Sequence, residues 1–199
     1  MNPILSILTP SIPSRLIQLD ESDHNIKPAA WLIREIERQS KGLPVEHLVL
    51  CDNRARSIGA KRQSLVDSAQ GRYIAQVDDD DDVSPDYVEK LLAAAESNAD
   101  VITFRQRAIY NGLESEVHFG INNQDGPFTP GGITLRAPWH VCAWRRDVVH
   151  GCQFGLSNYG EDREWCMQAR KRVRTAHHID AVLHTYRHHA ATTAAPEGA

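Results

Sequence analysis

The sequence lacks the features that define several protein classes. Its four cysteines form no CxxC pair, so there is no sign of a zinc ribbon or of a disulfide framework. No segment approaches the roughly 18 apolar residues of a membrane-spanning helix, and the N-terminus has no basic stretch before a long apolar run. A formal charge of -4 gives no overall attraction to nucleic acid or anionic membranes. We therefore expect a soluble, cytoplasmic protein.

Charge is distributed unevenly along the chain. The stretch 136–189 contains 9 Lys and Arg against 5 Asp and Glu, a local charge of +4, whereas the remainder has 13 against 21, a charge of -8. The same stretch holds 7 of the 10 histidines. An acidic part joined to a basic part would suit a ligand that brings both a metal and negative charge. Ordinary variation of surface charge can also produce this difference between the two parts.

Strand-like and helix-like segments alternate through residue 104. Strands are expected at 3–9, 45–50, 73–77 and 101–104, and helices at 28–41, 57–69 and 84–98. This alternation predicts parallel strands joined by crossover helices, an α/β fold in which ligands bind at the carboxyl ends of the strands. Thr9, Asp52 and Asp78 occupy those ends.

The pattern is looser after residue 105. Asn111-Gly112 predicts the turn of a β-hairpin. The other expected elements are a loop at 10–14, a loop at 122–132, short helices at 143–150 and 160–171, an extended segment at 174–186 and a frayed tail at 190–199.

Five consecutive aspartates, 78–82, directly follow one of the apolar strands. Clustered carboxylates raise one another's pKa unless a cation or a hydrogen-bond donor neutralises them. Their hard oxygen atoms suit Mg²⁺, Mn²⁺ or Ca²⁺. The alternative is a solvated acidic loop that caps the next helix, because Ser84-Pro85 is a good N-cap and first-turn pair.

The segment 71–92 resembles the DxD region of glycosyltransferase family 2, whose members have the GT-A fold. There an apolar strand ends in Asp-x-Asp-Asp before a Pro-Asp-Tyr helix start, which aligns the motif with Asp78, Asp80 and Asp81. The resemblance implies that Asp78 contacts the ribose of the donor or the hydration shell of a metal. Asp80 would ligate that metal, Mn²⁺ or Mg²⁺.

The other two aspartates take lesser roles in the same alignment. Asp79 fills the variable position of the motif and is counted with the donor-binding residues, and Asp82 is expected to cap the following helix.

Further segments are similar to the donor-binding parts of the family. Thr9 ends the strand that contacts the nucleoside, although the usual Tyr-Asn that follows is absent. Asp52 matches the aspartate that binds a uracil-like base, with Cys51 in place of the preceding aspartate. Lys61 and Arg62 match a segment that meets the base or phosphate. The alternative is a surface helix with solvated cations.

The segment 158–165 resembles the Gly-Glu-Asp motif of the family, which implies that Asp162 is the general base. The alternative is that Asp162 caps its helix, a role that Glu161 could also fill. Trp139 and His140 lie where the family builds the sugar and acceptor pocket, to which Glu161 also belongs. Aromatic side chains stack on sugars, but a buried Trp is more often core.

The end of the domain is similar to the Tyr-Arg-x-His ending of the family. The resemblance implies that His189 completes the metal shell and that Arg187 meets the diphosphate. His184 and His188 compete with His189 for the metal.

The resemblance implies a GT-A α/β fold with a mixed, mostly parallel sheet and a small acceptor-side lobe. One catalytic domain would span 1–189, divided into a nucleotide-sugar-binding half at 1–104 and an acceptor-side half at 105–189, before a flexible tail at 190–199. It would move a sugar, with inversion and with a metal, from a nucleotide-diphospho-sugar, first of all a UDP-sugar, to an acceptor hydroxyl.

Two alternatives share this architecture. A non-catalytic nucleotide- and metal-binding module would keep the same residues. A nucleotidyltransferase would normally have a glycine-rich loop after the first strand, and residues 9–13 contain no glycine. The acceptor could be a polysaccharide, a small glycoside or, as a polyanion, DNA with a hydroxylated base.

Overall fold

A computed structural model describes residues 2–17 and 29–188 of the chain. The strands are β1 (Leu5–Ser11), β2 (Val45–Cys51), β3 (Tyr73–Gln76), β4 (Asp82–Val83), β5 (Val101–Tyr110), β6 (Leu113–Phe119), β7 (Ile133–Arg136), β8 (Ala143–Arg145) and β9 (Ala176–His188). The helices are α1 (Pro13–Ile17), α2 (Ala29–Ser40), α3 (Ile58–Ser68), α4 (Tyr87–Ala95), α5 (Arg146–Val149) and α6 (Glu161–Arg170). The predicted α/β class is confirmed.

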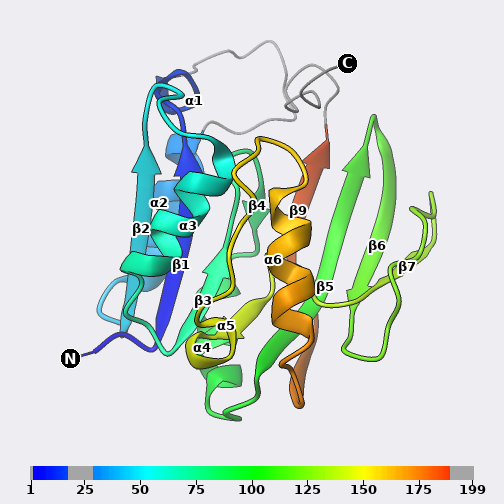
Figure 1. Cartoon of the computed structure of the whole chain (residues 1–199). Coiled ribbons are helices and arrows are strands. Elements are labelled where there is room, and N and C mark those ends of the chain that lie inside the picture. The colour runs from blue at the N-terminus through cyan, green and yellow to red at the C-terminus, as the bar shows by residue number, and fades with distance from the viewer. Residues whose placement is uncertain (1, 18–28, 189–199) are drawn as a thin grey trace.

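The strands form one mixed sheet in the order β2-β1-β3-β8-β5-β6-β7, and β9 pairs with β5 and with β4. β1 runs parallel to β2 and β3, and β9 runs parallel to β5. β8 is antiparallel to both β3 and β5, so that β5 has the same direction as β3. The carboxyl ends of β1, β2, β3, β5 and β9 therefore lie at one edge of the sheet, the upper edge in Figure 1.

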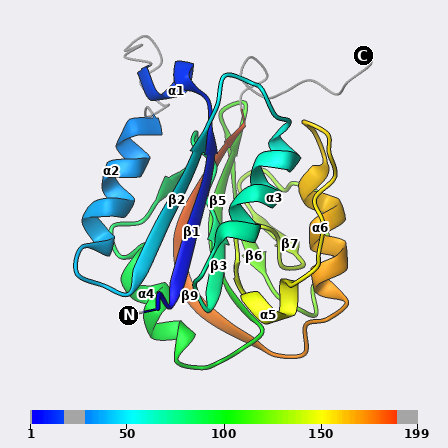
Figure 2. The same ribbon diagram turned by 60° about the vertical axis from the view of Figure 1, so that its left-hand side comes forward.

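Helices cover both faces of the sheet. α2 and α4 lie on one face, and α3, α5 and α6 lie on the other (Figure 2). The inward side of α2 is made by Ala29, Leu32 and Ile36, which recur at the three- and four-residue spacing of one helix face and are buried. Residues of this kind turn each helix toward the sheet and hold the strand ends in place.

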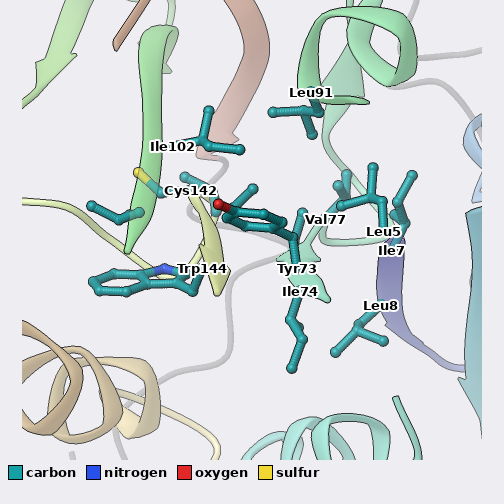
Figure 3. Packing of buried hydrophobic residues seen from close by; sticks show 14 of the residues in the cluster. Leu5, Ile7, Leu8, Tyr73, Ile74, Val77, Leu91, Ile102, Cys142 and Trp144 are labelled. Carbon is teal, nitrogen blue, oxygen red and sulfur yellow. The ribbon is translucent and has the colours of Figure 1, made fainter. Parts of the chain in front are cut away.

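The core is continuous from β1 across to β8. Tyr73 is fully buried, and its hydroxyl donates a hydrogen bond of 2.6 Å to the carbonyl oxygen of Ala99. Figure 3 shows its ring between Trp144 and Cys142 on one side and the β1 side chains on the other. This packing fixes β3, the strand from which the five aspartates continue.

Two element predictions in this region are wrong. Ala143–Arg145 begins no helix, because these residues fill the space between β3 and β5 as strand β8. The loop expected at 10–14 is strand up to Ser11 and helix from Pro13, since β1 continues its pairing with β2 as far as Cys51.

The start of α4 also differs from the prediction. α4 begins at Tyr87 with Asp86 as its N-cap residue, and the Ser84 hydroxyl donates to Asp86. Asp82 does not cap this helix, because it lies in β4 opposite Thr185.

The hairpin prediction is confirmed. Asn111 and Gly112 both have positive φ, 48° and 82°, as a two-residue turn between twisted strands requires. Within residues 2–17 and 29–188, no helix has the length and apolarity needed to cross a bilayer. The frayed tail predicted at 190–199 lies outside the described residues.

His47 generates a test of the fold. It lies on β2 with Nε2 3.0 Å from the Thr9 hydroxyl, and burial lowers its pKa from 6.5 to about 4. The folded protein therefore favours the neutral ring, and stability that is present above pH 6.5 is lost as the pH falls toward 4. Between pH 6.5 and pH 4, we expect the free energy of unfolding to fall by about 2 kcal/mol less in His47→Gln than in the wild type, because Gln takes up no proton. Urea unfolding at a series of pH values measures it, and an unchanged pH slope would contradict the assignment.

Candidate active site

The five aspartates lie at the edge where the parallel strands end. Asp78 to Asp81 follow β3, and Asp82 opens β4. Asp79, Asp81 and Asp82 are buried, whereas Asp78 and Asp80 keep part of their surface exposed. Each carboxylate contacts a cationic side chain or a histidine, so the run is not a solvated acidic loop.

Asp78 is paired with Arg62 of α3. The Nη2 atom of Arg62 lies 2.8 Å from Oδ1 of Asp78, its Nε donates over 3.0 Å to Glu161, and its Nη1 donates over 2.9 Å to Gln76. Burial pushes the pKa of Asp78 up, but Arg62 and His140 outweigh it and hold the pKa well below its usual range. Arg62 is buried, so it is not the solvated cation of the alternative interpretation.

Asp79 and Asp80 share Arg15 of the short helix α1. Its Nη1 atom lies 2.5 Å from Oδ1 of Asp79 and 2.7 Å from Oδ2 of Asp80. The Ser11 hydroxyl donates to the second oxygen of Asp79 over 2.7 Å. Burial raises the pKa of both carboxyls, and Arg15 opposes that rise.

Asp81 and Asp82 are held by β9. Nε2 of His184 lies 3.2 Å from Asp81, while the Gln106 amide donates to Nδ1 over 2.9 Å. Burial raises the pKa of Asp81 to about 6. Arg187 reaches Asp82 at 2.7 Å, so the residue predicted to meet the diphosphate is anchored to the aspartate run.

Three residues predicted to bind the donor, Thr9, Asp52 and Lys61, lie around the carboxyl ends of β1 and β2. The Lys61 ammonium lies 2.6 Å from Oδ1 of Asp52 and donates to the Ser11 carbonyl oxygen. Lys61 is buried, which excludes a solvated surface cation. Thr9 lies within β1, which ends at Ser11, and so is not at the strand end predicted for it; its side chain is fully buried against His47 and does not reach the surface of the site.

Asp162 lies in the first turn of α6, next to His140. Its Oδ2 atom accepts a hydrogen bond of 2.9 Å from the indole of Trp139 and lies 3.1 Å from Nδ1 of His140. The other nitrogen of His140 lies 3.8 Å from Asp78. These two His140 contacts are charge contacts without hydrogen-bond alignment. One imidazole thus lies between the carboxylates of Asp78 and Asp162.

The two carboxylates set the charge of His140. Burial and Arg62 lower its pKa, but Asp162 and Asp78 outweigh them and raise it to about 9. In turn, His140 and the Trp139 indole hold the pKa of Asp162 below its usual range against the effect of burial. Asp162 is therefore an anion with a fixed orientation.

Trp139 and Glu161 are occupied by neighbouring side chains. The guanidinium carbons of Arg136 and Arg170 each lie 4.8 Å from the centre of the Trp139 ring, which favours positioning of Asp162 over stacking on a sugar. Glu161 is bound to Arg62 and does not act as the helix cap.

The acidic side chains of the site bear on whether a divalent metal can bind there. Among residues 2–17 and 29–188, no group of three His, Cys, Asp or Glu side chains is arranged to hold an ion. However, Mg²⁺ at phosphate sites usually takes one or two carboxylates together with the phosphates of the substrate. The partly exposed side chains of Asp78 and Asp80 fit that donor set, with Oδ1 of Asp78 buried. His189, the predicted histidine ligand, lies outside the described residues.

Sequence reasoning missed the partners of the aspartates. Arg15 is the only Lys or Arg among the first 26 residues, a signal that could have marked it. His184 was considered only as a metal ligand, and nothing in its local sequence points to Asp81. His188, the other competitor, stacks on Tyr110 with a ring separation of 4.7 Å.

Arg62 provides a test of the buried network. Arg62→Met would leave the carboxylates of Asp78 and Glu161 without their cation, and we expect a loss of about 3–5 kcal/mol in the free energy of unfolding. Arg38→Met removes the cation of an exposed pair with Glu35 and should change little. Equal effects of the two substitutions in urea unfolding would contradict the described network.

Comparison with solved structures shows the fold. The chain superposes on S. aureus TarS 1-349 in complex with UDP-GlcNAc with a TM-score of 0.60 and 13% identity, covering 95% of this chain and 60% of that one. On S. aureus TarS 1-349 in complex with UDP it superposes with a TM-score of 0.58 and 14% identity, covering 92% of this chain and 60% of that one. On S. aureus TarS the TM-score is 0.57 and the identity 12%, with 92% of this chain and 36% of that one covered. The chain thus spans about 60% or less of these proteins.

Comparison with protein families identifies the chain more directly. No curated protein matches it significantly. The model of the family "Glycosyl transferase family 2" matches residues 35–151, which is more than half of the chain and includes the aspartate run and His140. The chain therefore belongs to glycosyl transferase family 2.

Proposed function

We propose that the protein transfers a sugar from a nucleotide-diphospho-sugar to an acceptor hydroxyl with inversion at the anomeric carbon. The observation that carries the proposal is the position of His140 between Asp78, on the donor side, and Asp162, on the acceptor side. Membership of family 2 supports it, and so do the similar TarS structures in complex with UDP-GlcNAc and with UDP. A UDP-sugar is therefore the first donor to test.

The donor would bind across the ends of β1, β2 and β3. Asp52, held by Lys61, would accept a hydrogen bond from the base, and Asp78 would contact the ribose. Arg62 and Asp79 act mainly by holding neighbouring groups in place. Arg187, close to Asp82, would lie toward the diphosphate.

Asp80 would hold Mn²⁺ or Mg²⁺, together with the diphosphate and with His189. When bound, such an ion supplies positive charge to the leaving nucleoside diphosphate. The carboxylate of Asp80 is partly exposed, which suits a ligand shared with the donor.

Asp162 would remove the proton of the acceptor hydroxyl as that oxygen attacks the sugar. Trp139 and His140 both contact Oδ2 and so fix the carboxylate plane. The pKa of Asp162 is lowered, which fits a proton that leaves late in the transition state. A single displacement assisted by one base inverts the anomeric configuration.

Three arginines of the C-terminal half are already paired with acidic side chains. Arg170 is paired with Asp125 at 2.8 Å, and Arg136 lies 3.9 Å from the same residue. Arg145 is likewise paired with Asp100 and Asp147. Because these three arginines already have acidic partners, we propose a polysaccharide or a small glycoside as the acceptor class in preference to a polyanion such as DNA.

Replacement of the base gives the first test of this function. Asp162→Asn should lower kcat by about 10²–10⁴-fold, since the amide cannot take the proton, while donor affinity stays within a few fold. Asp147→Asn, an exposed carboxylate on α5, serves as the control and should be unaffected. Normal turnover by Asp162→Asn would show that another group is the base.

A second test addresses donor and metal together. We expect a UDP-sugar with Mn²⁺ to raise the melting temperature more than GDP-, TDP- or CDP-sugars, and more than any of them without metal.

In calorimetry, Asp80→Ala should abolish the metal-dependent part of nucleotide binding. Unchanged affinity with Mn²⁺ would contradict the role of Asp80. Binding without either transfer or release of free sugar would instead indicate a non-catalytic module.

A further inference from the structure

Arg15 contacts both Asp79 and Asp80, and Asp80 is the residue to which the proposed function assigns the metal. We propose that Arg15 is an internal counter-cation that competes with the divalent ion for Asp79 and Asp80, so that ion binding requires Arg15 to leave the pair. The inference rests on the proposed function in one respect, the assignment of a metal to Asp80.

The contact geometry supports direct competition. A single nitrogen, Nη1 of Arg15, lies 2.5 Å from one oxygen of Asp79 and 2.7 Å from one oxygen of Asp80. It therefore bridges two carboxylates with one positive charge, as a small cation would. An ion bound to Asp80 through the same oxygen and Arg15 cannot both keep these distances, because both fill the same space and carry like charge.

The other side chains that contact the run are poor candidates for displacement. The side chains of Arg62 and His184 are 5% and 0% exposed, and they come from α3 and from the long strand β9. The Arg187 side chain is 19% exposed and also belongs to β9. Arg15 is the most exposed of the four at 26%, and it comes from a helix of five residues.

Asp79 and Asp80 differ in the contacts that they would keep if the divalent ion replaced Arg15. The Ser11 hydroxyl donates to its second oxygen, so Asp79 keeps one partner if Arg15 departs. Asp80 has no second contact of this kind within the described residues and is 27% exposed, which leaves it to the incoming ion. A released guanidinium could in turn meet the diphosphate of the donor, because Arg binds phosphate in a bidentate fashion.

This competition predicts weak metal binding in the absence of nucleotide. If Arg15 is on the acidic pair for about nine-tenths of the time, the apparent affinity for the ion is reduced about tenfold. Removing Arg15 should restore the intrinsic affinity. The effect should appear in metal binding itself, independently of any turnover.

The test is a titration of the full-length protein with Mn²⁺ alone, in which electron paramagnetic resonance counts the unbound ion. Arg15→Met should tighten Mn²⁺ binding about tenfold or more relative to the wild type. Arg15→Lys retains the charge on a single ammonium, without the guanidinium fork, and its affinity should fall between the two. Arg56→Met removes an exposed cation at the same edge that makes no described contact with Asp79 or Asp80, and it should change affinity by less than about twofold.

The possible results separate the two proposals. Equal Mn²⁺ affinity in the wild type and Arg15→Met, with binding that Asp80→Ala abolishes, would overturn the competition and leave the metal site standing. Equal tightening by Arg15→Met and Arg56→Met would reduce the effect to net charge and also overturn it. If none of the variants binds Mn²⁺, the metal assignment itself fails and the competition fails with it. If Arg15→Met does not fold, affinity of Arg15→Lys equal to that of the wild type overturns the inference.

Discussion

The pairing of the buried Arg62 guanidinium with Asp78 is the interaction on which the rest of the site depends. Arg62 also binds Glu161 and Gln76, so one side chain joins α3, α6 and the end of β3. Removing one member of a buried ion pair leaves an uncompensated charge, which typically costs about 3–5 kcal/mol. Asp78 and the start of α6, which the proposed function assigns to the donor and the acceptor, therefore share one electrostatic anchor.

Five adjacent carboxylates are tolerated because their partners come from different parts of the fold. Arg15 follows β1, Arg62 belongs to α3, and His184 and Arg187 belong to β9. These segments are distant in sequence and meet only where the strands end. The charge balance of the run is thus a product of the sheet topology, which leaves the side chains of Asp78 and Asp80 partly exposed.

The sequence was sufficient for the elements with strong local signals. The apolar runs of β1 and β3, the capped helix α3 and the Asn111-Gly112 hairpin need no distant residue to be recognised. It was not sufficient for β8, whose three residues become strand only between β3 and β5. The partners of the aspartates were missed for the same reason, because a contact such as that of His184 with Asp81 depends on strands that meet in space.

The central claim is that Arg62 and Asp78 act as one unit, and a double-mutant cycle tests it most directly. The free energy of unfolding would be measured for the wild type, Arg62→Met, Asp78→Asn and the double variant. The described geometry predicts a coupling energy of about 1.5 kcal/mol or more, with the double variant less destabilised than the sum of the single variants. Additivity within about 0.5 kcal/mol would contradict the account.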